Sequence, residues 1–125
     1  MKILVVEDSS AMRAFVRASL EEALGAEVHE ASNGFEALRL LPRDAYAAVI
    51  VDINMPDVNG LELISFMRSA QAHEHTPIVL ISTEATPSDR ERGLTLGANA
   101  FLEKPFGTDD LVATVRAVTA SASTQ

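Results

Sequence analysis

Four apolar runs of the sequence lead into residues whose side chains could take part in phosphoryl chemistry. Glu7 and Asp8 follow the run KILVV, Asp52 ends VIVD, Ser82 ends PIVLIS, and Lys104 follows FLE. Carboxylates bind a hard cation such as Mg²⁺, and a cation with an ammonium group neutralises charge on phosphoryl oxygens. A carboxylate can also attack phosphorus and form an acyl phosphate. If folding brings these residues together, the sequence predicts a phosphoryl-binding site centred on Asp52.

The apolar runs are typical of β-strands, and they alternate with segments of helical periodicity. The patterns predict strands at residues 2–8, 26–31, 47–53, 77–82 and 100–104. A helix is predicted after each strand. These helices are marked by Met12, Phe15, Val16 and Leu20; by Phe35, Leu38 and Leu41, with Pro42 closing the helix; by Leu61, Ile64 and Met67; by Thr86 as a cap before Pro87; and by Leu111, Val115 and Val118.

Five β–α units imply parallel strands joined by right-handed crossovers, so we expect a doubly wound α/β sheet with helices on both faces. The second strand is the most polar and is expected at an edge. Ligands of such sheets bind beyond the carboxyl ends of the strands, where the winding reverses. If the first and third strands are neighbours, Glu7, Asp8 and Asp52 meet there. Each like-charge contact costs about 1 kcal/mol in water and about 4 kcal/mol at an effective dielectric of 20, and Mg²⁺ would offset this repulsion.

Composition indicates one compact domain. Of the 125 residues, 47% are hydrophobic, which suits a single core over residues 1–120, followed by a disordered tail or linker at residues 121–125. The absence of cysteine excludes disulfides and thiolate metal sites. The net charge of −8, from 10 basic and 18 acidic residues, disfavours direct binding to nucleic acid.

No targeting or membrane-spanning segment is apparent in the sequence. Glu7 and Asp8 interrupt the first apolar run before it reaches the length of a signal-peptide core. No apolar run approaches the roughly 20 residues that a membrane span needs. We therefore expect a cytoplasmic protein that does not insert into a membrane.

Four motifs together resemble the receiver domain of two-component response regulators. They are VVED, VDINMPDVNG, PIVLIST and FLEKPF, and they occur in the family's order at the expected strand ends. The resemblance runs from about Lys2 to Val118. It implies a flavodoxin-like sheet of five strands in the order 2-1-3-4-5.

The resemblance also implies roles for the acidic residues. Asp52 would be the phosphoacceptor. Asp8 and Asp52 would bind Mg²⁺ directly, Glu7 would act through a water molecule, and the backbone carbonyl of Asn54 would be a further ligand. Asn54 and Glu84 would flank the phosphoryl group and tune its hydrolysis.

Further roles concern the response to phosphorylation. Ser82 would be the switch hydroxyl, Lys104 would contact the phosphoryl group, and the peptide before Pro105 would be cis. Phe101 would be the aromatic residue whose rotamer reports the state. Two residues depart from the commoner family choices: Ser82 stands where Thr is usual, and Phe101 stands where Tyr is usual, so no phenolic hydroxyl is available.

As a receiver, the protein would catalyse only its own phosphorylation and dephosphorylation and would not be an enzyme in the usual sense. Its partners would be a histidine kinase or phosphotransfer protein and a downstream protein that binds the face formed by the fourth helix, fifth strand and last helix. We expect a stand-alone regulator of motility or chemotaxis. The alternative is a receiver excised from a multidomain regulator or a hybrid histidine kinase.

Other functions fit the residues less well. A haloacid-dehalogenase-like phosphatase also has an aspartyl nucleophile, but it needs a general-acid Asp at the position that Asn54 occupies here. No flavin-type phosphate loop follows the first strand. His73 and His75 could form a metal-binding pair, although no third ligand has suitable spacing. His29, in the predicted edge strand, is expected to be exposed.

Overall fold

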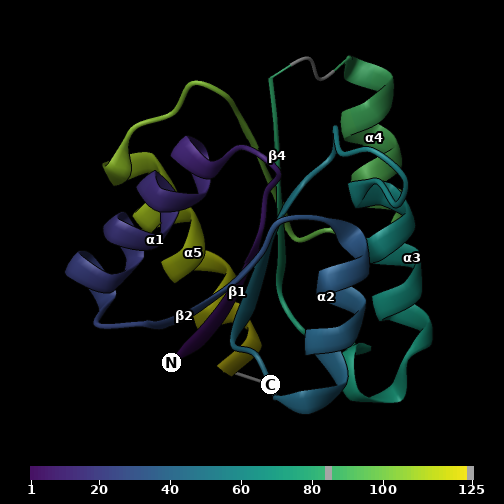
Figure 1. The fold of residues 1–125 in the computed structure, drawn as a ribbon, viewed down its shortest axis with the longest axis horizontal. Coiled ribbons are helices and arrows are strands. Elements are labelled where there is room, and N and C mark those ends of the chain that lie inside the picture. Colours follow the sequence, from purple (N-terminus) through teal and green to yellow (C-terminus); the bar gives the residue numbers. More distant parts are fainter. Residues whose placement is uncertain (84–85, 124–125) are drawn as a thin grey trace.

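The computed structural model describes residues 1–83 and 86–123 and shows one parallel sheet between two layers of helices (Figure 1). The strand order is β2-β1-β3-β4-β5. This confirms the predicted fold class and strand order. The strands are β1 (Lys2–Val6), β2 (Glu27–Ala31), β3 (Ala48–Asp52), β4 (Ile78–Ser82) and β5 (Ala100–Glu103).

The helices divide between the two faces of the sheet. In Figure 1, α1 and α5 lie on one side, and α2, α3 and α4 lie on the other. The α-helices are α1 (Ser10–Leu24), α2 (Gly34–Leu40), α3 (Gly60–Ser69), α4 (Pro87–Leu96) and α5 (Thr108–Ser123). Two single turns of 3-10 helix, η1 (Leu41–Arg43) and η2 (Gln71–His73), precede β3 and β4.

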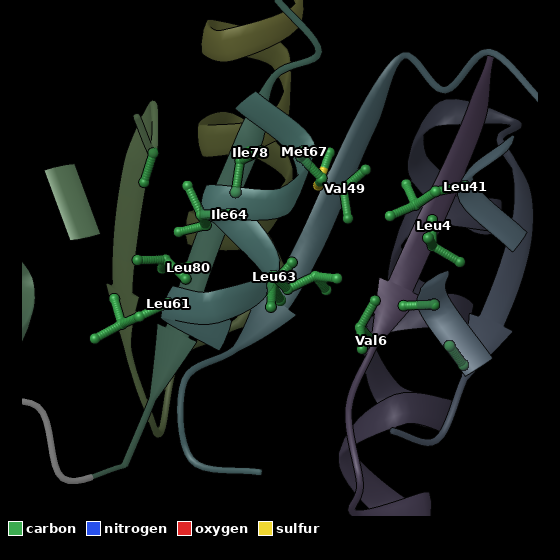
Figure 2. Packing of buried hydrophobic residues seen from close by; sticks show 14 of the residues in the cluster. Leu4, Val6, Leu41, Val49, Leu61, Leu63, Ile64, Met67, Ile78 and Leu80 are labelled. Carbon is green, nitrogen blue, oxygen red and sulfur yellow. The ribbon is translucent and has the colours of Figure 1, made fainter. Parts of the chain in front are cut away.

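The core consists of two clusters because successive strand residues point to opposite faces. Leu4 and Val6 face α2 and α3, in the cluster drawn in Figure 2. Ile3 and Val5 face α1 and α5. The strands β1, β3 and β4 are buried on both faces, which explains why their sequences are apolar throughout.

Polar caps set the start of several helices and so fix where each strand-end loop stops. Ser9 caps α1. Thr86 caps α4 with Pro87 as the first helical residue, which confirms the predicted start of this helix. Asn59 caps α3 in a reciprocal pair with Glu62. These caps place the helix N-termini at the edge of the sheet where the strands end.

α5 continues to Ser123, three residues beyond the expected end of the receiver at residue 120. Two local expectations were wrong. Pro42 lies inside η1, and α2 has already ended at Leu40. His29 is half-buried because its ring packs edge-on against Tyr46 and hydrogen-bonds the tyrosine hydroxyl at 3.0 Å. Within the described residues, no helix is both long enough and apolar enough to cross a membrane.

Candidate functional site

The sheet register places the predicted site residues at one edge of the molecule. Val6 pairs with Val51 and Asp52 pairs with Ile81, so β1, β3 and β4 end at similar heights. β1 lies between β2 and β3. The chain adds β2 on one side of β1 and then β3, β4 and β5 on the other side, so the direction of winding reverses between β1 and β3. The carboxyl ends of the strands lie towards the top of Figure 1. The predicted residues therefore meet where the winding reverses, as expected.

Three carboxylates form a compact acidic cluster at this edge. One oxygen from each of Glu7, Asp8 and Asp52 lies within 4.8 Å of the others. Glu7 is completely buried and Asp52 is 3% exposed, whereas Asp8 faces solvent. Hard oxygen donors that include an exposed carboxylate suit Mg²⁺, which keeps several water ligands. The donor set therefore fits the expected cation.

The ammonium group of Lys104 places a positive charge beside two of these carboxylates. Its ammonium nitrogen lies 2.7 Å from Glu7 Oε2 and 3.5 Å from Asp52 Oδ2. The lysine side chain is only 8% exposed. The peptide between Lys104 and Pro105 is cis, as the family resemblance implied. Two buried carboxylates thus share one buried ammonium group.

One ammonium group leaves Asp52 in an unfavourable environment for a negative charge. Burial raises the pKa of Asp52 to about 7, and the charge of Glu7 acts in the same direction. Lys104 and the backbone N–H of Asn54 oppose this shift in the pKa. A further cation at the cluster would favour the ionised form, which is the nucleophilic form.

The loop after β3 folds back onto the end of that strand. The Asn54 N–H donates to Asp52 Oδ1 at 3.1 Å, and the Gly60 N–H donates to the Ile53 carbonyl at 3.1 Å. A β-carbon at Gly60 would lie 2.6 Å from the Asp52 carbonyl oxygen. Glycine is therefore required for this close approach of the loop, which also carries the Asn54 N–H that contacts the Asp52 carboxylate.

Ser82 is buried beside this loop, with 1% of its surface exposed. The side-chain amide of Asn54 donates to its hydroxyl oxygen at 2.7 Å. The sequence did not predict this contact, because the two residues are 28 positions apart and meet only through the pairing of β3 with β4. The Asn54 amide thus links the Asp52 loop to the predicted switch hydroxyl.

Phe101, the predicted reporter of the state, is half-buried. It pairs with Leu80 in the sheet and packs against the cluster of Figure 2. The Arg90 guanidinium carbon lies 5.7 Å from the centre of the ring. The remaining exposed part of Phe101 thus adjoins α4. Glu84, the other predicted tuning residue, lies outside the described residues.

The histidine pair is not a metal site. His73 is 2% exposed, and its ring nitrogens contact the Leu41 carbonyl at 2.5 Å and the Thr76 hydroxyl at 3.1 Å. Both nitrogens therefore have protein partners, and His75 lies on the exposed surface. His73 joins η2 to η1 and has a structural role that the sequence pattern did not reveal.

Comparison with known proteins matches the response regulator receiver domain family over residues 3–116. The chain is 38% identical over 117 residues to the transcriptional regulatory protein HprR of Escherichia coli K12, covering 94% of this chain and 51% of that protein. This chain therefore spans about half the length of that curated relative.

Solved structures agree with this match. The chemotaxis protein CheY4 of Vibrio cholerae is 35% identical, with a TM-score of 0.88 over 94% of this chain and 97% of that one. The receiver domain of the sensor histidine kinase PA1611 from Pseudomonas aeruginosa PAO1 is 28% identical, with a TM-score of 0.86 over 95% and 97% of the two chains. That structure is described with a magnesium ion coordinated in its active-site cleft. The chain belongs to the response regulator receiver domain family, whose members are signalling modules that interact with histidine kinases and downstream targets.

Proposed function

We propose that this receiver accepts a phosphoryl group on Asp52 from a phosphohistidine of a histidine kinase or a phosphotransfer protein. The observation that carries the proposal is the position of Asp52. Its buried carboxylate lies 3.5 Å from the Lys104 ammonium and within the acidic cluster of Glu7 and Asp8. A nucleophilic carboxylate, an ammonium group and oxygen ligands for a cation are the parts that phosphoryl transfer to an aspartate requires.

In the proposed reaction, an Asp52 carboxylate oxygen forms a bond to phosphorus while the bond from phosphorus to the donor imidazole nitrogen breaks. Lys104 neutralises charge on the phosphoryl oxygens, and backbone N–H groups of the loop after β3 hold another oxygen. Glu7, Asp8, Asp52 and the Asn54 carbonyl would hold Mg²⁺, which supplies positive charge that favours ionised Asp52 and neutralises the phosphoryl group. The magnesium ion of the Pseudomonas receiver supports this assignment.

The proposed output is a change of the surface formed by α4, β5 and α5. Ser82 would donate a hydrogen bond to a phosphoryl oxygen, and its displacement would let Phe101 turn further inward. A charge-assisted hydrogen bond contributes about 1.5–3 kcal/mol. Such a bond biases a two-state equilibrium by one to two powers of ten, so we expect the active form to be a minor population before phosphorylation.

Two native contexts have support. The Vibrio cholerae chemotaxis protein is matched over 97% of its length, which favours a stand-alone, cytoplasmic regulator of motility or chemotaxis with residues 1–120 as the receiver. HprR is matched over 51% of its length, which favours the receiver of a larger transcriptional regulator. In both contexts Asp52 has the same role, and the downstream partner is a protein.

The signalling proposal is tested by amide NMR with beryllofluoride as a phosphoryl mimic. In the parent, adding the mimic with Mg²⁺ should shift resonances around Asp52 and around Phe101. Ser82→Ala should bind the mimic but give smaller shifts at Phe101, because the hydroxyl that couples the two places is absent. Ser65→Ala, at an exposed position of α3, should respond as the parent does. Full-sized shifts at Phe101 in Ser82→Ala would refute the hydroxyl-driven switch.

A further inference from the structure

Arg13 occupies a position that does not favour a cation. It lies one turn into α1, where its N–H donates to the carbonyl of the capping residue Ser9 at 2.9 Å. Positive charge is unfavourable near a helix N-terminus, and the first turn of α1 contains no acidic residue. The Arg13 guanidinium instead has partners outside its helix. It donates to the Glu7 carbonyl at 2.8 Å and to the Glu30 carboxylate at 3.1 Å.

The Glu7 carbonyl belongs to the peptide that leads into Asp8. Glu7 is fixed at its other polar groups as well: its N–H donates to the Ala31 carbonyl at 3.1 Å, and its carboxylate accepts from the Ser9 N–H at 3.0 Å and from Lys104 at 2.7 Å. Arg13 therefore completes the set of contacts that orient this residue.

Asp8 depends on that orientation. Its side chain is exposed, and within the described part of the chain it forms no hydrogen bond or ion pair. The direction in which the Asp8 side chain leaves the backbone is thus set by the residues on either side of it. One side is the Glu7 carbonyl, held by Arg13, and the other is the Ser9 cap of α1.

We propose that Arg13 is a positioning residue for the cation site, acting through the Glu7–Asp8 peptide. The inference deepens the proposed function and rests on it, because it concerns how the Mg²⁺ ligands are held. Glu30 holds the guanidinium in the required direction, and it accepts a second hydrogen bond from Arg17, which also pairs with Glu21. Edge strand β2 and helix α1 together therefore support the acidic pair.

The charge of Arg13 and its contact with the Glu7 carbonyl predict opposite effects on Mg²⁺ binding when the side chain is removed. A positive charge near the cluster repels Mg²⁺, so its loss by itself would tighten binding of the cation. Loss of a positioning contact would weaken binding, and removing such an outer contact typically raises a metal dissociation constant about tenfold or more. The direction of the change therefore distinguishes the two effects.

The experiment is an amide NMR titration with MgCl₂ at constant ionic strength, which also suits a chain without tryptophan. Arg13→Ala should raise the Kd for Mg²⁺ about tenfold. Arg17→Ala is the matched control, because Arg17 also binds Glu30 but does not contact the Glu7 carbonyl. Arg17→Ala should leave the Kd for Mg²⁺ unchanged or lower it slightly. A Kd for Arg13→Ala equal to or below that of the parent would overturn the positioning role.

Arg13→Lys keeps the charge but loses the forked geometry that reaches both partners. It should give an intermediate Kd, and it carries the test if Arg13→Ala fails to fold. A Kd for Arg13→Lys equal to that of the parent would then overturn the positioning role. A parent that shows no response to Mg²⁺ would overturn the cation site and the role of Arg13 together. A responsive parent with unchanged Arg13 variants would overturn only the role of Arg13.

Discussion

Asp52 is a carboxylate whose surroundings oppose its own ionisation. Burial and the neighbouring Glu7 raise its pKa to about 7, and the Lys104 ammonium offsets this only in part. A buried carboxylate with a raised pKa lowers the stability of the fold when it is ionised and no cation is bound. It is suited to a site in which a cation and an incoming phosphoryl group change the charge balance.

This environment predicts how stability depends on pH without Mg²⁺. The pKa of Asp52 is raised from 3.8 to about 7 on folding, so between these values the folded state binds more protons than the unfolded state. The free energy of unfolding should therefore fall as pH rises from about 4 to about 7, and this contribution should be constant above that range. Each unit of pKa difference corresponds to about 1.4 kcal/mol.

Urea denaturation of the parent and Asp52→Asn at pH 5 and pH 8 measures this contribution. Asp52→Asn cannot titrate at this position, so it should lose less stability between the two pH values than the parent does. Subtracting the loss of stability in Asp52→Asn from the loss in the parent removes the contribution of the other carboxylates. Equal losses in the two proteins would show that Asp52 does not titrate with a raised pKa.

At the scale of elements, the loop between β3 and α3 must approach the strand end closely. Gly60 permits this approach, because a β-carbon there would lie 2.6 Å from the Asp52 carbonyl. We predict that Gly60→Ala lowers the free energy of unfolding by about 1–3 kcal/mol and slows phosphorylation, since the loop that carries Asn54 must move. Gly107→Ala is the control, because its β-carbon would have no neighbour within 4 Å. Similar thermal stabilities of the two variants would contradict the close-approach argument.

The positions of the strands could be predicted from sequence because each apolar run ends on a polar residue. Asp52 and Ser82 are the last residues of β3 and β4, and Glu7 directly follows β1. The strand order, in contrast, came from the resemblance to receiver domains. Parallel pairing alone does not determine which strands are neighbours, and the acidic cluster exists only because β1 lies beside β3.

Contacts made by side chains across elements could not be predicted from spacing. Arg13 reaches back from α1 to the Glu7 carbonyl, and Asn54 reaches the hydroxyl of Ser82. His73 is buried because η2 turns it towards the Leu41 carbonyl, whereas its sequence surroundings are polar. Each of these contacts depends on the packing of segments that are distant in the chain or on a short turn without a periodic pattern.

At the scale of the whole molecule, repulsion in the acidic cluster should couple cation binding to stability. For a Kd of about 1 mM, about 10 mM Mg²⁺ should stabilise the fold by roughly 1.4 kcal/mol. In a domain of this size, that corresponds to a rise of about 3–6 °C in Tm. Asp8→Asn should be more stable than the parent without Mg²⁺ and should gain less from it.

Thermal melting with and without Mg²⁺ checks this prediction. Asp109→Asn is a matched control, because Asp109 is an exposed acid of α5 outside the cluster. It should gain as much from Mg²⁺ as the parent. Equal gains in the parent and in Asp8→Asn would show that the cation does not bind at the shared carboxylates.

The most direct test of the central claim is incubation with acetyl phosphate and Mg²⁺ followed by intact-mass measurement. The parent should gain one phosphoryl group per chain, because Asp52 is the proposed nucleophile. Asp52→Asn should gain none, and Asp109→Asn should be labelled as the parent is. Labelling of Asp52→Asn to the parent's extent would contradict the assignment of Asp52, and sustained turnover of a small phosphate ester would contradict a signalling role.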